Sequence, residues 1–311
     1  MPWKKGNRLR AVSEQDASPE VYSVYAEIMQ KLGVPRVNVL FQVYASYPGF
    51  LELHWKLFGP IVESGEFFQL AERLRADAYT RAHNYFVIAN LRPQLDALHF
   101  TEGAKQELAG LIDLFAYNDP LLLLISAAQQ QAFDGVIGTG HLALLPPTPG
   151  YFEKRPVLLE EESTEPDVRR VFEEFRQVYG LSMVSQDFRA LARWPDFLRV
   201  YWELLQPLLA SPLYRECQFG IHESAWTLAR ELPGTLELTL DQMTAAGMSE
   251  DDVASVVRLT QAFTRSLSSS LLNISIAKIG IEGGNHVQTV AKEKERVHSS
   301  VAGGSTPNQA A

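Results

Sequence analysis

The chain has 311 residues, a net charge of −9 and a sequence pI near 5.4. That length suits two ordinary domains, or one domain made of two similar halves. The acidic charge argues against a nucleic-acid binder, which would carry a basic stripe. A single cysteine, Cys217, excludes an internal disulfide framework and cysteine-rich metal sites. No apolar run is long enough to span a membrane, and none follows the basic N-terminus, so we expect a cytoplasmic protein with no membrane partner.

The pattern along the chain predicts helices throughout. Residues 1–17 are polar and aperiodic, and we interpret them as a flexible arm. A helix is expected to begin with Ser18 as N-cap and Pro19 in its first turn, and to end at Gly33. Apolar residues at helical spacing predict further helices, one ending before Pro48 and others over 50–61, 66–88 and 102–133. The alternating run at 235–240 is too short to decide between strand and helix, so the predicted fold class is all-α.

Residues 134–164 differ in character from the helical segments. This stretch contains three spaced glycines, a PPTPG cluster and an acidic patch, which are typical of a linker. Beyond it, residues 165–284 are again helical in pattern, and the polar tail 285–311 is expected to be disordered. The predicted organisation is therefore two helical units, 18–133 and 165–284, joined by a long linker.

The two units are related in sequence. Shifting the numbering by 147 places residues 20–64 on 167–211 without a gap, and 15 of the 45 paired positions are identical where chance gives about three. Identical pairs include Gly33/Gly180, Trp55/Trp202 and Ser64/Ser211. With a shift of 148 the match continues through Phe115/Phe263 and Leu124/Leu272. We interpret this match as an internal repeat that forms a pseudo-dimer with approximate two-fold symmetry.

Two exceptions to the repeat are the sharpest chemical signal. Leu40 of the first copy corresponds to Asp187 of the second, and Asp119 of the first corresponds to Leu267 of the second. Each copy therefore carries one carboxylate that the other lacks. Equivalent elements of a pseudo-dimer meet at its axis, so the two carboxylates are expected to share one site.

Each carboxylate also has a structural interpretation. Asp187 could cap the helix that follows it, although Leu40 cannot cap and the same helix is expected there. Asp119 precedes Pro120, which suits the first turn of a helix, so Asp119 is a natural N-cap, and a helix N-terminus can also bind an anion. Asn118 and Tyr117 would lie beside it as neutral hydrogen-bonding groups.

Other chemistry is weakly supported. The histidines show no metal-ligand spacing, so no metal is expected. Cys217 and His222 lie five residues apart, which places them on different faces of a helix and argues against a nucleophilic pair.

Three segments resemble one known family. FAYNDPLLLLI, QDFRALARWPDFL and SYPGFLELHW, within a duplicated helical chain, are similar to the group I 2-haloacid dehalogenases over about residues 18–284. The resemblance implies that Asp187 is the catalytic base and that Asp119 occupies the position of the family's second polar residue, an Asn. It also places the family's Thr-x-x-x-Glu pair on Ser64 and Phe68, which lack the acid.

The resemblance further implies a cofactor-independent reaction. Asp187 would take a proton from a water that displaces halide from a short 2-haloalkanoic acid with inversion. Asp119 would assist it, and Asn118, Tyr117 and Gln186 would bind the small-molecule substrate. Two carboxylates and a charged substrate cannot all stay ionised in one site, so a protonated Asp119 would imitate Asn. A hydrolase acting on an uncharged substrate with the same Asp pair, and a non-catalytic relative, are the alternatives. The sequence leaves a homodimer open.

Overall fold

The computed structural model describes residues 10–47, 49–162, 165–180 and 183–285. The N-terminal residues 1–9, Pro48, and the predicted tail from residue 286 lie outside these ranges. Within them the chain forms twelve helices. In order these are α1 (Pro19–Leu32), α2 (Val39–Tyr44), α3 (Phe50–Val62), α4 (Gly65–Tyr85), α5 (Arg92–Ala97), α6 (Glu102–Ala132), α7 (Pro166–Tyr179), α8 (Gln186–Leu191), α9 (Pro195–Leu209), α10 (Pro212–Ala229), α11 (Leu240–Ala245) and α12 (Glu250–Glu282).

The prediction of an all-α fold is confirmed for this part of the chain. The alternating run at 235–240 contributes only an isolated antiparallel bridge between Ile137 and Leu236, and α11 begins at its last residue. Helix starts follow the expected capping chemistry. Ser18 accepts a hydrogen bond from the Val21 N–H at the start of α1, and Gly33 ends that helix in the left-handed conformation, φ 67°.

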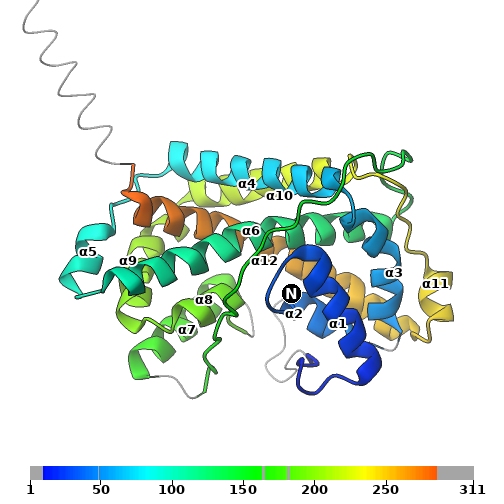
Figure 1. The fold of residues 1–311 in the computed structure, drawn as a ribbon, viewed down its shortest axis with the longest axis horizontal. Helices are drawn as coiled ribbons and strands as arrows, with labels where there is room; N and C mark the ends of the chain where they lie inside the picture. Colours follow the sequence, from blue (N-terminus) through cyan, green and yellow to red (C-terminus); the bar gives the residue numbers. More distant parts are fainter. Residues whose placement is uncertain (1–9, 48, 163–164, 181–182, 286–311) are drawn as a thin grey trace, which may run out of the picture.

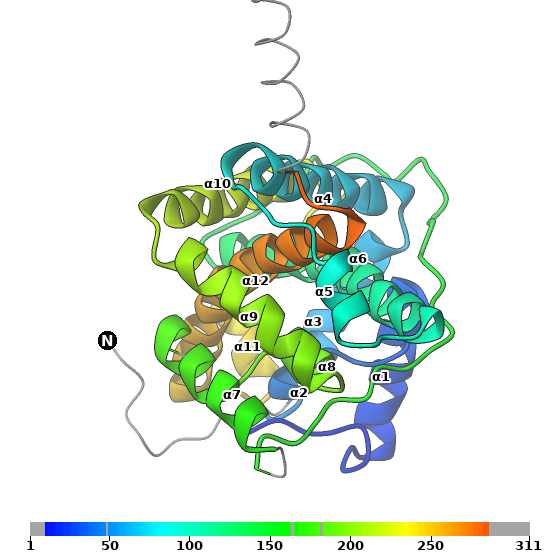
Figure 2. The same cartoon turned by 90° about the vertical axis from the view of Figure 1, so that its left-hand side faces the viewer.

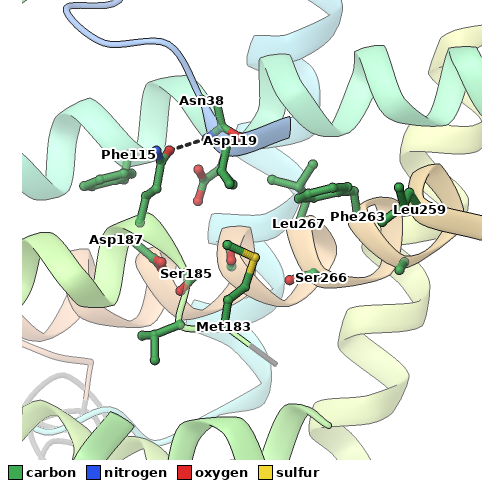
Figure 3. A pocket seen from close by; sticks show the side chains of 15 residues that line it. Asn38, Phe115, Asp119, Met183, Ser185, Asp187, Leu259, Phe263, Ser266 and Leu267 are labelled. Atoms are coloured by element: carbon green, nitrogen blue, oxygen red, sulfur yellow. Dashed lines mark hydrogen bonds between the residues drawn. The ribbon is translucent and has the colours of Figure 1, made fainter. Parts of the chain in front are cut away.

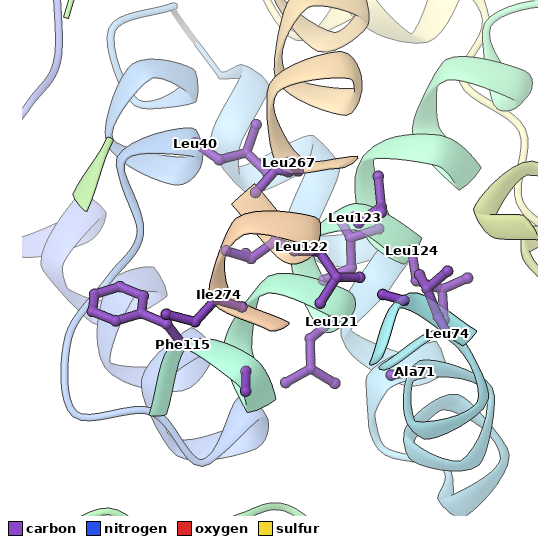
Figure 4. Close-up of a cluster of buried hydrophobic side chains, with 14 of the residues drawn as sticks. Leu40, Ala71, Leu74, Phe115, Leu121, Leu122, Leu123, Leu124, Leu267 and Ile274 are labelled. Atoms are coloured by element: carbon purple, nitrogen blue, oxygen red, sulfur yellow. The ribbon is translucent and has the colours of Figure 1, made fainter. Parts of the chain in front are cut away.

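The two longest helices, α6 and α12, form the centre of the fold (Figure 1). They pack against each other and against both α4 and α10, which lie side by side over them in both views (Figure 2). The run Leu121–Ile125 of α6 is at most 1% exposed and projects into the surrounding helices (Figure 4). This helix has the length and hydropathy of a membrane span, but 72% of its apolar window is buried inside the fold. The core therefore accounts for its apolar composition.

The expectation that a helix begins at Pro120 is wrong. Pro120 lies inside α6, which continues unbroken from Glu102 to Ala132. A proline inside a helix removes one hydrogen bond and costs about 3 kcal/mol. Burial of the leucines that follow it offsets this cost, since each buried leucine contributes about 2 kcal/mol.

The part of the predicted linker that the structure describes, residues 134–162, crosses the surface as an extended chain (Figure 1). It is attached at several points: the Gly65 N–H donates to the Leu145 carbonyl, Glu66 accepts from the N–H groups of Leu144 and Leu145, and Leu159 donates to the Arg189 carbonyl. The predicted N-terminal arm is attached too, because the Val12 N–H donates to the Gln42 carbonyl. Both segments therefore contact the helical body where the structure describes them.

Candidate active site

Asp187 lies in the first turn of α8, one residue after the helix begins. Ser185 occupies the N-cap position, and Asp187 is 3% exposed. The next residue, Phe188, anchors the helix, because its ring packs within 5.8 Å of the rings of Phe175, Tyr201 and Trp202. Asp187 is therefore buried because it is next in the chain to Phe188, whose ring packs into the core.

Several groups act on the Asp187 carboxyl. Burial raises its pKa, and hydrogen bonds from the Ser185 side chain and from the N–H groups of Phe188 and Asp187 oppose that rise. The Ser185 hydroxyl is close enough to have this effect, although its oxygen completes no hydrogen bond of good geometry within the described residues. Asp187 is therefore not the N-cap that the sequence left open, because Ser185 occupies that position and the helix begins at Gln186.

Asp119 lies in the middle of α6 and is 4% exposed. It cannot be the N-cap that the sequence suggested, because the helix begins 17 residues earlier, at Glu102. Its Oδ2 atom finds no hydrogen-bond partner in the described part of the chain. Burial, and then the negative charge of Asp187, raise the pKa of Asp119 well above its usual range.

Both carboxyl groups line the same cavity, which has a volume of about 70 Å³ (Figure 3). Since one water needs roughly 10–15 Å³ measured in this way, the cavity holds several waters or one small ligand. Its wall is largely apolar, from Phe115, Phe263 and Leu267 among others. None of the described side chains that line it is a lysine or an arginine.

The electrostatics of the pair favour one shared negative charge. Asp119 has the larger upward shift and no hydrogen-bond donor on Oδ2, whereas Asp187 interacts with two backbone N–H groups and Ser185. Of the two groups, Asp119 therefore holds a proton more strongly, and Asp187 ionises first. Such a pair offers a proton acceptor next to a hydroxyl donor.

The predicted substrate-binding residues are distributed unequally. Gln186 lines the cavity, and its Oε1 accepts a hydrogen bond of 2.8 Å from Asn38 Nδ2. Asn118 lines a smaller neighbouring pocket that shares Phe115 and Gln186 with the main cavity. Tyr117 lines neither pocket, so the structure does not bring it to the site.

Tyr117 instead has structural contacts. Its hydroxyl donates to the Leu32 carbonyl at 2.7 Å and accepts from the Gly150 N–H at 2.6 Å, and its ring packs on Phe152. Tyr117 thus links Gly150 of the surface segment to the last residue of α1 by hydrogen bonds. Each residue along a helix turns the side-chain direction by about 100°. Tyr117 and Asp119 are two positions apart, so they project from nearly opposite sides of α6 and could not both face the cavity.

Besides Ser185, three polar lining residues were not identified from the sequence. Asn38 precedes α2, and Ser266 and Ser270 lie one turn apart on α12. A signal for Asn38 was present, because it lies 147 positions before Ser185, at the start of the matching helix. For the serines the signal was the segment SLSSS at 266–270, which holds four serines in five residues next to a buried part of α12.

The remaining sequence candidates lie elsewhere. Ser64 caps α4, accepting from the Phe67 N–H at 3.2 Å, and Phe68 packs in the core, so neither lines the cavity. His222 stacks on Trp226, and the buried Cys217 lies on the same helix, α10. Three or more potential metal ligands do not converge anywhere in the described ranges.

The family model described as "Halocarboxylic acid dehydrogenase DehI" matches residues 35–188, a range that contains both carboxylates. An (R)-2-haloacid dehalogenase from Pseudomonas putida is 24% identical over 273 residues, covering 86% of this chain and 91% of the relative. A configuration-inverting 2-haloacid dehalogenase from Alcaligenes xylosoxydans xylosoxydans is 24% identical over 285 residues, covering 88% and 95%. The chain belongs to the group I 2-haloacid dehalogenase family.

The fold of this chain is also that of a solved structure, a D-2-haloacid dehalogenase mutant in complex with D-2-CPA. The two align with a TM-score of 0.85 and 24% identity, over 90% of this chain and 98% of that one. The all-α architecture is thus that of the family.

Proposed function

We propose that this protein is a hydrolase of the carbon–halide bond that converts a short 2-haloalkanoic acid to the 2-hydroxy acid with inversion of configuration. The observation that carries the proposal is the pair of buried carboxyl groups, Asp187 and Asp119, lining one small cavity with an otherwise apolar or neutral wall. Family membership supports the class of reaction.

In the proposed reaction Asp187 is the general base. A water in the cavity gives one proton to the Asp187 carboxylate while its oxygen forms a bond to C2 of the substrate. The bond from C2 to the halogen breaks, and the halide leaves with the bonding electrons from the opposite face, which inverts C2. Asp187 then returns its proton to solvent, so each turnover yields one hydroxy acid, one halide and one proton. Neither a covalent ester nor a cofactor takes part.

The substrate carboxylate is the difficult part of this assignment. With no lysine or arginine among the described lining residues, neutral groups must bind it. The available groups are the hydroxyls of Ser185, Ser266 and Ser270 and the protonated carboxyl of Asp119. Protonated Asp119 donates one hydrogen bond, as an Asn would, and leaves a single protein charge beside the substrate.

The same lack of a cation supports a second candidate, hydrolysis of an uncharged small substrate by the same pair. A 2-halocarboxamide would avoid bringing a third carboxyl group into the cavity. Comparing kcat/KM for 2-chloropropionamide and 2-chloropropionate separates the two candidates.

We also propose that the fold is a duplicated pseudo-dimer with units 18–133 and 165–284 joined by the linker 134–164. In support, the helices form two series of similar length: 14, 6, 13, 21, 6 and 31 residues, then 14, 6, 15, 18, 6 and 33. Trp55 donates to Glu27, and Trp202, 147 residues later, donates to Glu174. The counterparts of the two acids, Leu40 and Leu267, both belong to the buried hydrophobic cluster (Figure 4). Duplication followed by specialisation of one of two related sites accounts for these features together.

The test of the catalytic proposal is halide release from each enantiomer of 2-chloropropionate. Asp187→Asn keeps the shape of the side chain but removes the base, so turnover should fall about 10²- to 10⁴-fold. Asp187→Leu, which copies the residue at position 40, should be equally inactive. Thermal melting of both variants is the control for folding. Full activity of Asp187→Asn in a folded protein would assign the base to another residue.

Cytoplasmic location and a homodimeric state stay predictions. Fractionation of cells and sedimentation of the purified protein test them.

A further inference from the structure

Behind Asp187 lies a buried cluster of polar side chains that the proposed reaction does not use. Tyr179 of α7, Tyr201 of α9, Tyr214 of α10 and Asn273 of α12 meet there. Tyr201, Tyr214 and Asn273 are each at most 3% exposed. Asn273 joins the others: its Oδ1 accepts from Tyr214 at 2.6 Å, its carbonyl accepts from Tyr201 at 2.8 Å, and its Nδ2 donates to Tyr179 at 2.7 Å.

The matching positions of the first half of the chain hold no such cluster. Offsets of 147 and 148 lead from these four residues back to Leu32, His54, Phe67 and Ile125. All four are fully buried, and neither ring nitrogen of His54 finds a hydrogen-bond partner in the described part of the chain. Polar side chains therefore replace apolar packing only in the half that carries Asp187. A buried polar network has a cost in folding, so its restriction to one half points to a use.

One hydroxyl proton in the cluster is left uncommitted. Tyr214 and Tyr201 each donate their single proton to Asn273, and Tyr179 accepts from it. Among the described residues, the acceptor found for the proton of Tyr179 is the Tyr214 oxygen at 3.4 Å, which is long for an O–H···O bond. Tyr179 can therefore orient its hydroxyl dipole toward a nearby negative charge.

The cluster is coupled to Asp187 through packing and through charge. Phe188 packs on Tyr201 with ring centroids 5.7 Å apart and on Phe175 at 4.7 Å, and Phe175 packs on Tyr179 at 4.5 Å. The charge of Asp187 raises the pKa of both Tyr179 and Tyr201. The titratable groups that face Asp187 are thus Asp119 on α6, Tyr179 on α7 and Tyr201 on α9. The cavity side of α12 adds only the neutral hydroxyls of Ser266 and Ser270.

We infer that Tyr179, Tyr201, Tyr214 and Asn273 are positioning residues that fix α8 through Phe188 and stabilise the ionised form of Asp187. The inference rests on the proposed role of Asp187 as the base. In this inference the hydroxyl dipole of Tyr179 partly replaces the water that burial has removed from around the carboxylate, and Tyr201, Tyr214 and Asn273 hold Tyr179 and Phe188 in place. Without them the same burial would keep Asp187 protonated to a higher pH, where it cannot accept a proton from water.

The test compares Tyr179→Phe and Tyr201→Phe with Tyr44→Phe as the matched control. Tyr44 is also fully buried, and its hydroxyl contacts Thr260 at 3.1 Å, away from the cavity lining. All three changes remove one buried hydroxyl and should lower the melting temperature similarly. In Tyr179→Phe the acid limb of the kcat/KM profile should move up by at most about one pH unit, because a hydroxyl dipole near the carboxylate is lost. In Tyr44→Phe it should stay in place.

The second readout does not depend on activity. Carbon-13 NMR of protein labelled at the aspartate carboxyl carbons, with Asp187→Asn to assign the signal, gives the pKa of Asp187 directly. It should rise in Tyr179→Phe and in Tyr201→Phe, and not in Tyr44→Phe. An unchanged Asp187 titration in both variants would overturn the inference even if the wild type releases halide. If the wild type releases no halide but the titration moves as expected, the proposed function fails and the inference holds.

Discussion

Asp119→Asn should stabilise the protein, and by an amount that grows with pH. The change keeps the shape of a side chain that is 4% exposed but removes a carboxyl group whose Oδ2 has no partner among the described residues. Burial and the charge of Asp187 raise the pKa of this group well above its ordinary value of 3.8. In the unfolded chain the group ionises near that value, so above it the unfolded state binds fewer protons than the folded state. Stability is therefore lost as the pH rises above 3.8, until the pH reaches the folded pKa.

The magnitude follows from the proton that Asp119 keeps. Each pH unit above 3.8 at which the folded state holds this proton costs about 1.4 kcal/mol. At pH 7 the ceiling is about 4 kcal/mol, which matches the range of about 1–4 kcal/mol gained when buried ionic groups are replaced by neutral ones. Asn does not titrate, so Asp119→Asn should recover this free energy at pH 7 and nothing near pH 4.

Urea unfolding of both proteins at pH 4, 5.5 and 7 measures the difference. The difference in unfolding free energy between the two proteins should change by up to about 1.4 kcal/mol per pH unit. That is the largest slope that one retained proton can produce. Activity supplies a second reading. The alkaline loss of kcat/KM that comes from ionisation of Asp119 should disappear in Asp119→Asn, while the acid limb set by Asp187 remains. A stability difference that is the same at all three pH values would refute the reasoning, because Asp119 would then ionise normally in the fold.

Three further predictions follow from buried groups outside the cavity. Trp55→Phe removes the indole hydrogen bond to Glu27, and Trp202→Phe removes the one to Glu174. Urea unfolding should show a similar loss of about 1–3 kcal/mol of stability in each variant. A loss confined to one of them would weaken the duplication proposal. Burial lowers the pKa of His54 from 6.5 to about 3, so the unfolded state binds more protons between these values and stability falls as the pH drops through that window. His54→Phe should remove on the order of 4 kcal/mol of this acid sensitivity in melts at pH 7 and pH 4, and parallel losses in the two proteins would contradict it. Leu40→Asp places a second copy of the acid at a fully buried site that is not among the lining residues of the Asp187 cavity, and should cost about 3–5 kcal/mol by the same assay.

Local sequence signals predicted most of the helices because they depend on neighbours alone. Ser18, Pro19 and Gly33 bound α1 as capping chemistry requires, and the apolar spacing located α3, α4 and α6 to within a few residues. The six-residue helices α5 and α11 were not predicted, since so short a helix shows less than two turns of periodicity. Pro120 was misread because a proline signals a helix start only when tertiary packing does not favour continuing the helix.

The candidate site depended on contacts that no local signal contains. The offset between the two halves singled out Asp187 and Asp119, and both line the cavity. Chain proximity to Asp119 suggested Tyr117 and Asn118, but the rotation of α6 turns both away from the main cavity. Asn38, Ser266 and Ser270 reach the cavity from α12 and the start of α2, and only the packing of distant helices brings them together.

The most direct test of the central claim is a single turnover in water enriched in oxygen-18, with enzyme in excess over 2-chloropropionate. If a water activated by Asp187 attacks C2 directly, the lactate formed carries the label in its hydroxyl group, and the peptide containing Asp187 carries none. Unlabelled lactate from that single turnover, with the label in the Asp187 carboxyl group, would show that Asp187 attacks the substrate itself and that water then hydrolyses the resulting ester at its carboxyl carbon. That result would contradict the account of Asp187 as a general base.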